Sequence, residues 1–529
     1  MRESRTKLLV GLAVALVVAA VGVLFVSGDG DRVETVAGEP SAVGTGRNLN
    51  SPAVTPDDVG DNNPLQAFVQ EVVTGQDGPE GDDESAEATT EGEPETDPAT
   101  DAEGTADDGD GVDADADTTT TTTEPPTTTA APAPAPPSTP SAPAPGTGQR
   151  ILYVDGSSGS DRNPGTEAAP FRRPITATLI AEPGDTIYLR GGTYDTSTHG
   201  AFNFRRSGTA ENWIRIAPYP GERVELVSGG EWGSAFEVLG ASYVEVAGFV
   251  MRGRSDSIHG VGVFIKDGAH DVRVMNNQIS GFGGGGVSLV EASRVLIEGN
   301  EVRDTAARSS FQGSAISLFE PAGPTASGND FSLVVRGNYV VGNYNGVPHH
   351  SSGRVTDGNC IIMDRFDLVG YTGRTLIENN VCIENGGRGV HSYGSSNIVA
   401  RNNTLYHNMW SPELDSGRGE LTAGKGRNIY FYNNLVVNRS GVASFISRDT
   451  ENTHFIKNWV RSGPPPGDSN RELPGGTIFG STNPDGPVEQ WRPVGSAGLS
   501  GTADGANQPS QDLFGQTRPS PGAIGAIEP

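Results

Sequence analysis

A two-residue marker, Asn-Asn or Gly-Asn, recurs between short Val- and Ile-rich runs and limits the possible folds of this chain more than any other feature. Counted from Gly248, the second residues of the markers are Asn277, Asn300, Asn338, Asn380, Asn403, Asn434 and Asn458. The steps between them are 29, 23, 38, 42, 23, 31 and 24 residues. Repeats of this length predict a solenoid, whose coils bury their apolar faces only by stacking on one another.

The composition of each repeat indicates strands rather than helices. The runs are rich in β-branched residues, and none has a helical periodicity long enough for a helical repeat. About 23 residues fit one coil of three short strands and three turns. In such a coil an asparagine tolerates a left-handed turn and can hydrogen-bond to its copy in the next coil. Turns that need positive φ also account for 73 glycines in 529 residues.

Three further segments carry a resemblance to a known family. They are an entrance at residues 153–166, a strand with a Gly-Gly turn at residues 183–194, and a closing Ile-Gly-Ala-Ile-Glu at residues 524–528. With the Asn-Asn-x-apolar and Gly-x-Gly-apolar repeats, residues 150–529 resemble the right-handed parallel β-helix proteins of the pectate-lyase-like superfamily. The resemblance implies an all-β solenoid. It implies no single reaction, because the fold carries lyases, hydrolases, epimerases and non-catalytic adhesins.

The repeat also predicts the interior. Strand alternation points one apolar residue of each coil inward, and these residues are Val263, Val287, Ile316, Ile361 and Val390. The segment from Pro174 to Ala181 is predicted to be a short helix that caps the open end of the solenoid. Cys360 and Cys382 are predicted to be buried free thiols, because the alignment places them in different strands.

The N-terminus predicts a membrane segment. Arg2, Arg5 and Lys7 precede an apolar run from Leu8 to Val26. This length favours a retained single-pass anchor at the cell membrane, since a bilayer core needs roughly 20 helical residues. The basic residues before the run predict that the rest of the chain faces outside. The alternative for residues 1–26 is a cleaved signal, which would give a secreted protein.

The acidic charge of the chain is concentrated in one segment. Residues 27–149 hold 27 Asp and Glu, two Arg and one aromatic residue, Phe68. Such a segment cannot bury enough apolar surface to order itself, so we predict a disordered stalk. Residues 150–529 hold 32 basic and 38 acidic side chains and are predicted to form one β-helix domain. Without a basic excess, nucleic acid is not expected as a partner.

The strand that opens each coil places polar residues on one outer face. Asp364 ends one such strand and Tyr393 ends the next, so we expect them to be neighbours about 4.8 Å apart. His391 lies two residues before Tyr393 on the same face, and Arg388 lies further along the strand. We predict that these four residues form one exposed patch. The alternative is an ordinary solvated strand surface without a function.

This patch is predicted to be the catalytic site of an enzyme that acts on an acidic polysaccharide. Arg388 would bind a uronate carboxylate in a bidentate manner. His391 would transfer a proton near neutral pH, and Tyr393 would stack on a sugar or donate a proton. The reaction would be proton abstraction next to a carboxylate, with an arginine or a cation stabilising the developing enolate.

A cation site is a further expectation. Asp364, with Asp357 and Asp367 as additional candidates, would supply carboxylate oxygens to a hard cation such as Ca²⁺. Calcium is therefore the one cofactor that the sequence suggests.

Inserted loops are predicted to complete the binding surface. The steps of 38 and 42 residues exceed one coil, and the extra residues fall around 321–330 and 345–355. Loops on a rigid scaffold often build binding sites. Trp410 is a natural sugar-stacking platform, and Arg418 and Lys425 are predicted to bind substrate with it. The same alignment places Leu421 beside His391 in the next coil.

Three functions follow as hypotheses. The first is a surface-anchored extracellular lyase or epimerase of an acidic glycan. The second is a non-catalytic protein that binds a glycan or the cell wall. The third is a glycoside hydrolase, which needs two carboxylates about 5–9.5 Å apart, such as Asp364 with Glu320 or Glu420. The sequence shows neither an Asp pair of the polygalacturonase type nor a clear Lys/Arg signature of a lyase.

Overall fold

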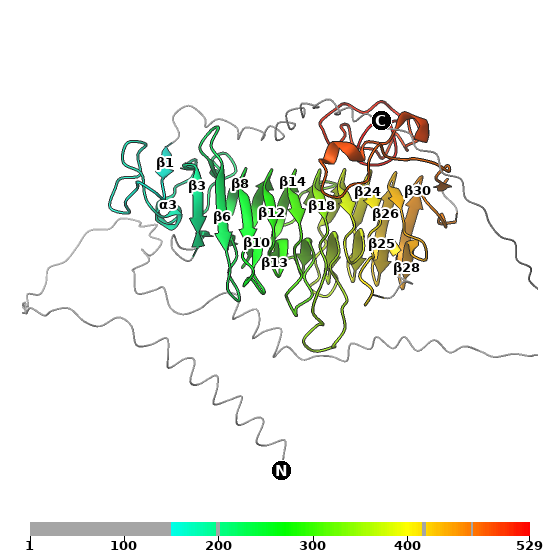
Figure 1. Ribbon diagram of the computed structural model, residues 1–529, viewed down its shortest axis with the longest axis horizontal. Helices are drawn as coiled ribbons and strands as arrows, with labels where there is room; N and C mark the ends of the chain where they lie inside the picture. The colour runs from blue at the N-terminus through cyan, green and yellow to red at the C-terminus, as the bar shows by residue number, and fades with distance from the viewer. Residues whose placement is uncertain (1–149, 197–201, 415–418, 467–468) are drawn as a thin grey trace, which may run out of the picture. The chain divides into compact units, whose positions relative to one another are not determined.

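The computed structural model describes residues 150–196, 202–414, 419–466 and 469–529. These residues form a right-handed parallel β-helix, in which three long parallel sheets run along one axis (Figure 1). Each sheet takes its strands from successive coils, so neighbouring strands in a sheet are one coil apart in sequence. The all-β solenoid predicted from the repeat is therefore confirmed.

Within a coil the chain passes through three sheets, which we call I, II and III in that order. Sheet I has nine strands, which are β4 (Phe202–Phe204), β7 (Phe236–Leu239), β10 (Val261–Lys266), β13 (Gly285–Val290), β16 (Ile316–Phe319), β19 (Ile361–Asp364), β22 (Val390–Tyr393), β25 (Gly419–Gly424) and β28 (Ala443–Arg448). Sheet II has eleven, which are β1 (Ile151–Val154), β2 (Thr186–Leu189), β5 (Ile214–Pro218), β8 (Ser242–Ala247), β11 (His270–Met275), β14 (Ser293–Glu298), β17 (Phe331–Arg336), β20 (Arg374–Glu378), β23 (Ile398–Arg401), β26 (Arg427–Tyr432) and β29 (Glu451–Ile456). Sheet III has eleven, which are β3 (Gly192–Asp195), β6 (Val224–Ser228), β9 (Val250–Gly253), β12 (Gln278–Ser280), β15 (Glu301–Arg303), β18 (Tyr339–Val341), β21 (Val381–Ile383), β24 (Thr404–Tyr406), β27 (Leu435–Val437), β30 (Trp459–Val460) and β31 (Arg471–Glu472).

The three sheets enclose a continuous apolar core. The five residues predicted to stack inside pair with one another in consecutive strands of sheet I. All five side chains are 0% exposed, and they are Val263, Val287, Ile316, Ile361 and Val390. The predicted interior is therefore confirmed, and its burial is the main favourable contribution to folding.

The predicted cap is also confirmed, as helix α3 (Pro174–Ile180). A proline fits the first turn of a helix, where its missing N–H has no partner to lose. Ala177 faces the core, and the helix contacts β1, β2 and β4 in the first coils. Two 3₁₀ helices, η2 (Val488–Trp491) and η3 (Gly495–Ala497), lie near the C-terminus.

The two residues of each marker have different structural roles at the corner between sheets II and III. The first residue takes the left-handed conformation, with φ of 54° at Asn276, 67° at Gly299 and 55° at Asn379. The second is buried and bonds to its copy, since Oδ1 of Asn300 accepts from both N and Nδ2 of Asn277 at 3.0 Å. This asparagine column consists of Asn277, Asn300, Asn338, Asn380, Asn403, Asn434, Asn458 and Asn470.

The second glycine of the Gly-x-Gly repeat has a different cause from the one the sequence suggested. An added Cβ at Gly262 would lie 2.3 Å from Cγ2 of Ile279, and one at Gly286 would lie 2.4 Å from Cγ1 of Val302. Ile279 and Val302 belong to sheet III of the same coils. At these two strands the opening of sheet I therefore runs so close to sheet III that a larger side chain does not fit.

The prediction of two free thiols is wrong. Cys360 stands at this narrow corner and forms a disulfide with Cys382 of β21, with a Cα–Cα distance of 5.8 Å. Cys382 lies in β21 and Cys360 directly precedes β19, so the alignment was right to place them in different parts of the coil. The corner between sheets I and III nevertheless brings those strands together across the interior of one coil.

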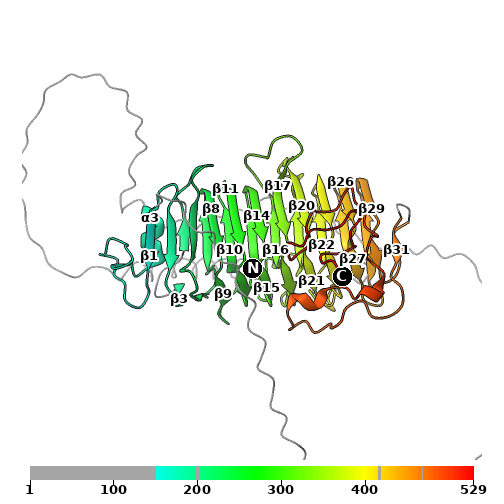
Figure 2. The ribbon, with the colours of Figure 1, turned by 90° about the horizontal axis from the view of Figure 1, so that it is seen from above.

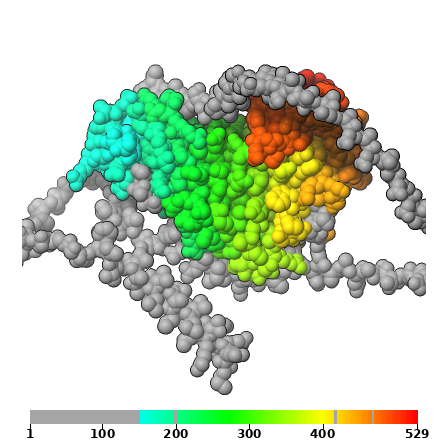
Figure 3. Space-filling model, in the orientation of Figure 1, coloured from blue at the N-terminus to red at the C-terminus, as the bar shows by residue number. Residues whose placement is uncertain are grey.

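The coils end at Glu472, so residues 473–529 do not continue the predicted β-helix. They cover the outer face of the later strands of sheet III with a second apolar cluster. In this cluster Trp491 is 0% exposed and donates its Nε1–H to the hydroxyl of Tyr339 at 2.8 Å. Figures 2 and 3 show the segment in orange and red along one side of the later coils.

The predictions for the N-terminal part need a correction. Residues 1–26, the predicted anchor or signal, and residues 27–149, the predicted stalk, lie outside the described residues. In the part of the chain that is described, no helix is both long and apolar enough to cross a membrane. The predicted cell-membrane location and membrane partner are withdrawn on this finding.

Replacing Asn338 by alanine is expected to lower the free energy of unfolding by about 3 kcal/mol. The change removes the acceptor of the main-chain N–H of Asn300 and the donor to the carbonyl oxygen of Ile297. Urea unfolding of the full chain measures the loss. The control is Asn428→Gly, which removes an amide that donates to Asn397 at the surface and should cost less than about 1 kcal/mol. Equal losses would contradict a special role for the buried column.

Replacing both cysteines by alanine is expected to lower the free energy of unfolding by about 3 kcal/mol, the value for a loop of this length. The bridge closes a separation of 22 residues, and it restricts the unfolded chain. Thermal melts with and without a reducing agent measure the effect. The reductant should lower the melting temperature of the wild type and leave the Cys360→Ala/Cys382→Ala variant unchanged. A reductant-insensitive wild type would show that the bridge does not stabilise the fold.

Candidate functional site

Two predicted site residues are neighbours on the outer face of sheet I. Asp364 ends β19, Tyr393 ends β22, and the strand register pairs them directly. Both side chains are partly exposed. On the other side of Asp364, the same place in β16 is taken by Phe319. The predicted contact between adjacent coils at this position is therefore confirmed.

Lys425 contacts Tyr393 from the next coil, and we call the three residues the Asp364–Tyr393–Lys425 cluster. Its Nζ donates to the Tyr393 hydroxyl at 2.8 Å and lies 5.1 Å from the centroid of the ring. The residue beside Tyr393 in β25 is Gly424. A Cβ added there would lie 3.2 Å from Cδ2 of Tyr393, so the glycine leaves room for the ring. This glycine was not among the residues predicted from the sequence.

The cluster has the groups needed to move a proton. The oxygen of Tyr393 accepts a hydrogen bond from an ammonium group, so its own proton is available to a ligand. The ammonium group of Lys425 is a second hydrogen-bond donor beside the phenol. Lys425 is exposed and Tyr393 is partly exposed, so a ligand can reach both from solvent. Next to them, Arg365 and Glu320 form an ion pair at 2.9 Å.

His391 and Arg388 are more deeply placed than predicted. The ring centroid of His391 lies 6.0 Å from that of Tyr393, but His391 is only 7% exposed. Arg388 is 3% exposed, and its Nη1 donates to the carbonyl oxygen of Thr356 at 2.9 Å. It precedes β22, at the opposite end of that strand from Tyr393. The expected exposed patch of four residues is therefore corrected, and Arg388 holds an inserted loop against its coil.

The predicted alignment of β25 is off by one residue. Thr422, rather than Leu421, pairs with His391. Leu421 points into the core and is 1% exposed. The loop before β25 differs in length from the equivalent loops of the other coils, so an alignment on its glycines misplaced the strand. The burial of Leu421 decides the register. Arg418 lies outside the described residues, and its role in substrate binding stays a prediction.

The three carboxylates suggested for a cation do not come together. Asp357 precedes β19 and accepts from Nδ2 of Asn359 at 2.8 Å, whereas Asp367 follows β19 and accepts from Oγ of Ser396 at 2.7 Å. Asp364 lies at the end of the strand. Within the described ranges no group of three or more His, Cys, Asp and Glu side chains is placed to hold a metal ion. The residues therefore do not fit the suggested Ca²⁺ site.

The inserted loops lie along the two edges of sheet I. Residues 320–330 connect β16 to β17, and residues 342–360 connect β18 to β19, where the two insertions were expected. Figure 1 shows the second loop in yellow-green beyond the strands. Trp410, in the loop that follows β24, is 42% exposed, and its ring lies 5.6 Å from that of Tyr344. Its exposure suits a sugar-stacking role, which stays a prediction.

A second buried column, which the sequence analysis missed, lies at the corner between sheets III and I. It consists of Thr305, Asn343, Asn385, Asn408 and Glu420. N and Nδ2 of Asn408 donate to the two carboxyl oxygens of Glu420, both at 2.8 Å. Burial raises the pKa of Glu420 to about 8, although these two donors oppose the shift. The hydrolase hypothesis that pairs Asp364 with Glu420 is wrong, because Glu420 is 0% exposed inside the coil.

Two family models match the coils described above. The model "Pel9A-like, right handed beta helix region" matches residues 152–315, and the model "Right handed beta helix region" matches residues 261–460. The chain therefore contains right-handed β-helix regions of the kinds that these two models describe. The two matches together extend from the first strand of this β-helix protein to β30.

Several known proteins are similar to this β-helix protein. The pectate lyase Pel9A structure shares 16% identity over 72% of this chain and 96% of its own, with a TM-score of 0.46. The lacto-N-biosidase of Eubacterium ramulus shares 13% over 59% of this chain and 56% of its own, with a TM-score of 0.37. The uncharacterized protein YwoF of Bacillus subtilis (strain 168) is 27% identical over 138 residues. That match covers 25% of this chain and only 28% of the relative.

The raised pKa of Glu420 predicts a pH dependence of stability. The folded chain keeps a proton up to about pH 8, whereas an unfolded glutamate releases it near the ordinary value of 4.5. The free energy of unfolding should therefore fall as the pH rises between these values. Glu420→Gln should remove this dependence, because a glutamine Oε1 can accept from both donors of Asn408, as each asparagine Oδ1 does in the columns.

Thermal melts at pH 5 and pH 8 measure this effect. The Glu420→Gln variant should gain stability relative to the wild type at the higher pH. Glu413→Gln changes an exposed carboxyl group nearby and should follow the wild type at both values. A Glu420→Gln profile parallel to that of the wild type would contradict the buried, protonated carboxyl group.

Proposed function

We propose that this β-helix protein is an enzyme that cleaves an acidic polysaccharide on the outer face of sheet I. The proposal rests on the contact of 2.8 Å between Nζ of Lys425 and the hydroxyl of Tyr393, with Asp364 beside Tyr393 in the adjacent coil. An ammonium group held on a partly exposed phenol suits proton transfer more than strand packing. The match of residues 152–315 to the Pel9A-like β-helix model supports a polysaccharide as the substrate class.

The proposed reaction is β-elimination at a uronate residue. Tyr393, as a phenolate stabilised by Lys425, takes the proton from the carbon next to the carboxylate. The electron pair of that C–H bond forms a carbon–carbon double bond, while the adjacent C–O glycosidic bond breaks with its electron pair on the leaving oxygen. His391, whose ring lies 6.0 Å from that of Tyr393, is proposed to protonate this oxygen. The charge of Lys425 also stabilises the enolate.

Two further residues have supporting roles in this proposal. Arg388 is a positioning residue, because it bonds to the carbonyl oxygen of Thr356 in the inserted loop rather than facing solvent. Trp410 offers an exposed ring on which a sugar can stack. If His391 instead delivered a proton to the opposite face of that carbon and the glycosidic C–O bond stayed intact, the same groups would act as an epimerase.

A non-catalytic glycan-binding protein is the second candidate. The observation that favours it is the burial of His391 and Arg388, which are 7% and 3% exposed. With these two side chains covered, the outer face keeps the Asp364–Tyr393–Lys425 cluster as its polar centre. Such a cluster can hold a sugar without transferring a proton.

Tyr393→Phe is expected to lower kcat at least a hundredfold, the usual effect of removing a general acid or base. The assay incubates the full chain with a panel of uronate polysaccharides and follows the ultraviolet absorbance of unsaturated products. The control is Tyr243→Phe, which changes a ring on sheet II that packs against Trp213 and should leave turnover unchanged.

The same assay separates the two candidates. Reducing ends released together with unsaturated products indicate elimination, and reducing ends without them indicate hydrolysis. If the wild type binds the polysaccharide and Tyr393→Phe only weakens that binding, with no product from either chain, the binding function replaces the enzyme.

A further inference from the structure

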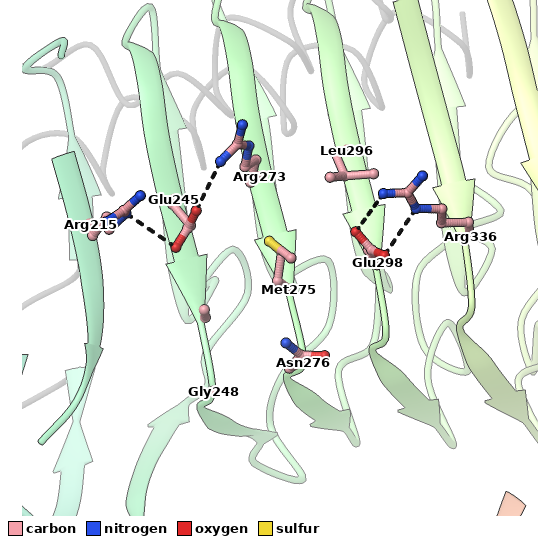
Figure 4. A pocket seen from close by; sticks show the side chains of 10 residues that line it. Arg215, Glu245, Gly248, Arg273, Met275, Asn276, Leu296, Glu298 and Arg336 are labelled. Carbon is pink, nitrogen blue, oxygen red and sulfur yellow. Dashed lines mark hydrogen bonds and ion pairs between the residues drawn. The ribbon is translucent and has the colours of Figure 1, made fainter. Parts of the chain in front are cut away.

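Charged side chains also line the outer face of sheet II, which is separate from the cluster on sheet I. Arg215, Glu245 and Arg273 take the same place in β5, β8 and β11. Glu298 and Arg336 pair in the next two strands, β14 and β17. These five residues surround a hollow of about 310 Å³ (Figure 4). Its apolar floor is formed by Ala247, Met275 and Leu296.

The ion pairs around this hollow are unequal. Arg336 holds Glu298 through two bonds of 3.0 and 3.1 Å, so each neutralises the other. Among the residues that the structure describes, Arg215 and Arg273 have one acidic partner between them, Glu245, at 3.6 and 3.4 Å, as the dashed lines in Figure 4 show. One positive charge therefore remains. The buried Nε–H of Arg215 has no hydrogen-bond acceptor among the described residues.

A second hollow, of about 270 Å³, lies further along the same face. Tyr430 and Tyr432 of β26 line it, and their rings are parallel to within 1° with centroids 5.8 Å apart. Arg374 and Arg401 also line it, and Arg401 is paired with Glu378 at 2.7 Å, so Arg374 adds one positive charge. Phenol, amide and guanidinium groups are the donors that suit sugar hydroxyls and carboxylates.

The two hollows lie on one line along the axis. Strand β8, between Arg215 and Arg273, and strand β26 are six places apart in sheet II, which corresponds to about 29 Å and to several residues of an extended glycan. Five arginines line the two hollows against three glutamates, namely Glu245 and Glu298 in the lining and Glu378 paired with Arg401, whereas residues 150–529 as a whole have more acidic than basic side chains. A positive face on an acidic domain attracts a polyanion.

We infer that the outer face of sheet II is a second binding site for an acidic polysaccharide, which lies along the helix axis. A uronate carboxylate bonds to Arg215 and Arg273, with its ring over Met275. A later residue of the same chain occupies the hollow at Tyr430 and Tyr432. The ligand class rests on the proposed function, but the site requires no chemistry on sheet I. It holds the polymer to the protein away from the cluster on sheet I.

Titration calorimetry of the full chain tests this inference with hexamers of galacturonate and of mannuronate, their trimers, and neutral cellohexaose. A hexamer that reaches both hollows should bind at least tenfold tighter than the trimer, and cellohexaose should not compete. Arg215→Gln/Arg273→Gln should weaken the hexamer at least tenfold. The control is Arg252→Gln on sheet III, which removes a comparable arginine paired with Glu225 at 3.0 Å and should change nothing.

Each titration is repeated in the Lys425→Gln chain, in which the sheet I cluster is impaired. The same tenfold loss is expected there. If the loss disappears in that chain, the binding belongs to sheet I and the inference is overturned. Unchanged affinity of the double arginine variant, or a wild type that binds neither hexamer, overturns it as well. The variant Arg215→Lys/Arg273→Lys keeps both charges and should bind the hexamer with intermediate affinity. If this variant binds as weakly as the glutamine variant, the loss reflects a folding defect and the inference is overturned.

The outcomes for the two sites are distinguishable. If hexamer binding falls in the double arginine variant and no chain turns over any polysaccharide, the second site is supported and the proposed enzyme is not. If turnover on sheet I is measured and the double arginine variant binds normally, the enzyme is supported and the second site is not.

Discussion

The buried asparagine column is the interaction on which the rest of the structure depends. From β8 onward, each corner between sheets II and III leaves a main-chain N–H that no strand pairs, and a buried N–H needs a partner. The side chain in the next coil supplies it, as Oδ1 of Asn380 does for N of Asn338 at 3.0 Å. Because these bonds run from coil to coil, they tie all three sheets to one register. Amides are stable in the core only because their copies satisfy them.

The second buried column applies the same principle where the inserted loops leave the coils. The loop of residues 342–360 leaves the corner at Asn343, whose N donates to Oδ1 of Asn385 at 3.1 Å. It is held again near its end by the bond from Arg388 to Thr356. A loop anchored at both ends on a rigid coil is a suitable support for a binding surface. Glu420 ends this column with a carboxyl group, so its last member can titrate.

The three outer faces have different surroundings. The later strands of sheet III are covered by residues 473–529, whose Trp491 packs into the second apolar cluster. Sheet I presents the Asp364–Tyr393–Lys425 cluster between the inserted loops, and sheet II presents the arginine-lined hollows. In a solenoid the inward side chains form one shared core, and the outward side chains form the surfaces. Each face can therefore carry a different binding site without changing the core.

The sequence by itself determined what repeats within a coil. The asparagine markers, the five stacked core residues and the contact of Asp364 with Tyr393 followed from period and alternation, which are local properties. Even the second column had a signal, since Asn343, Asn385 and Asn408 each follow a marker asparagine by five residues. Only the tertiary structure decided which parts of a coil meet across its interior, as with Cys360 and Cys382. It also decided the burial of Arg388 and His391 and the inward position of Glu420. Loop lengths vary from coil to coil, and a close approach at one corner does not recur at a fixed spacing in the sequence.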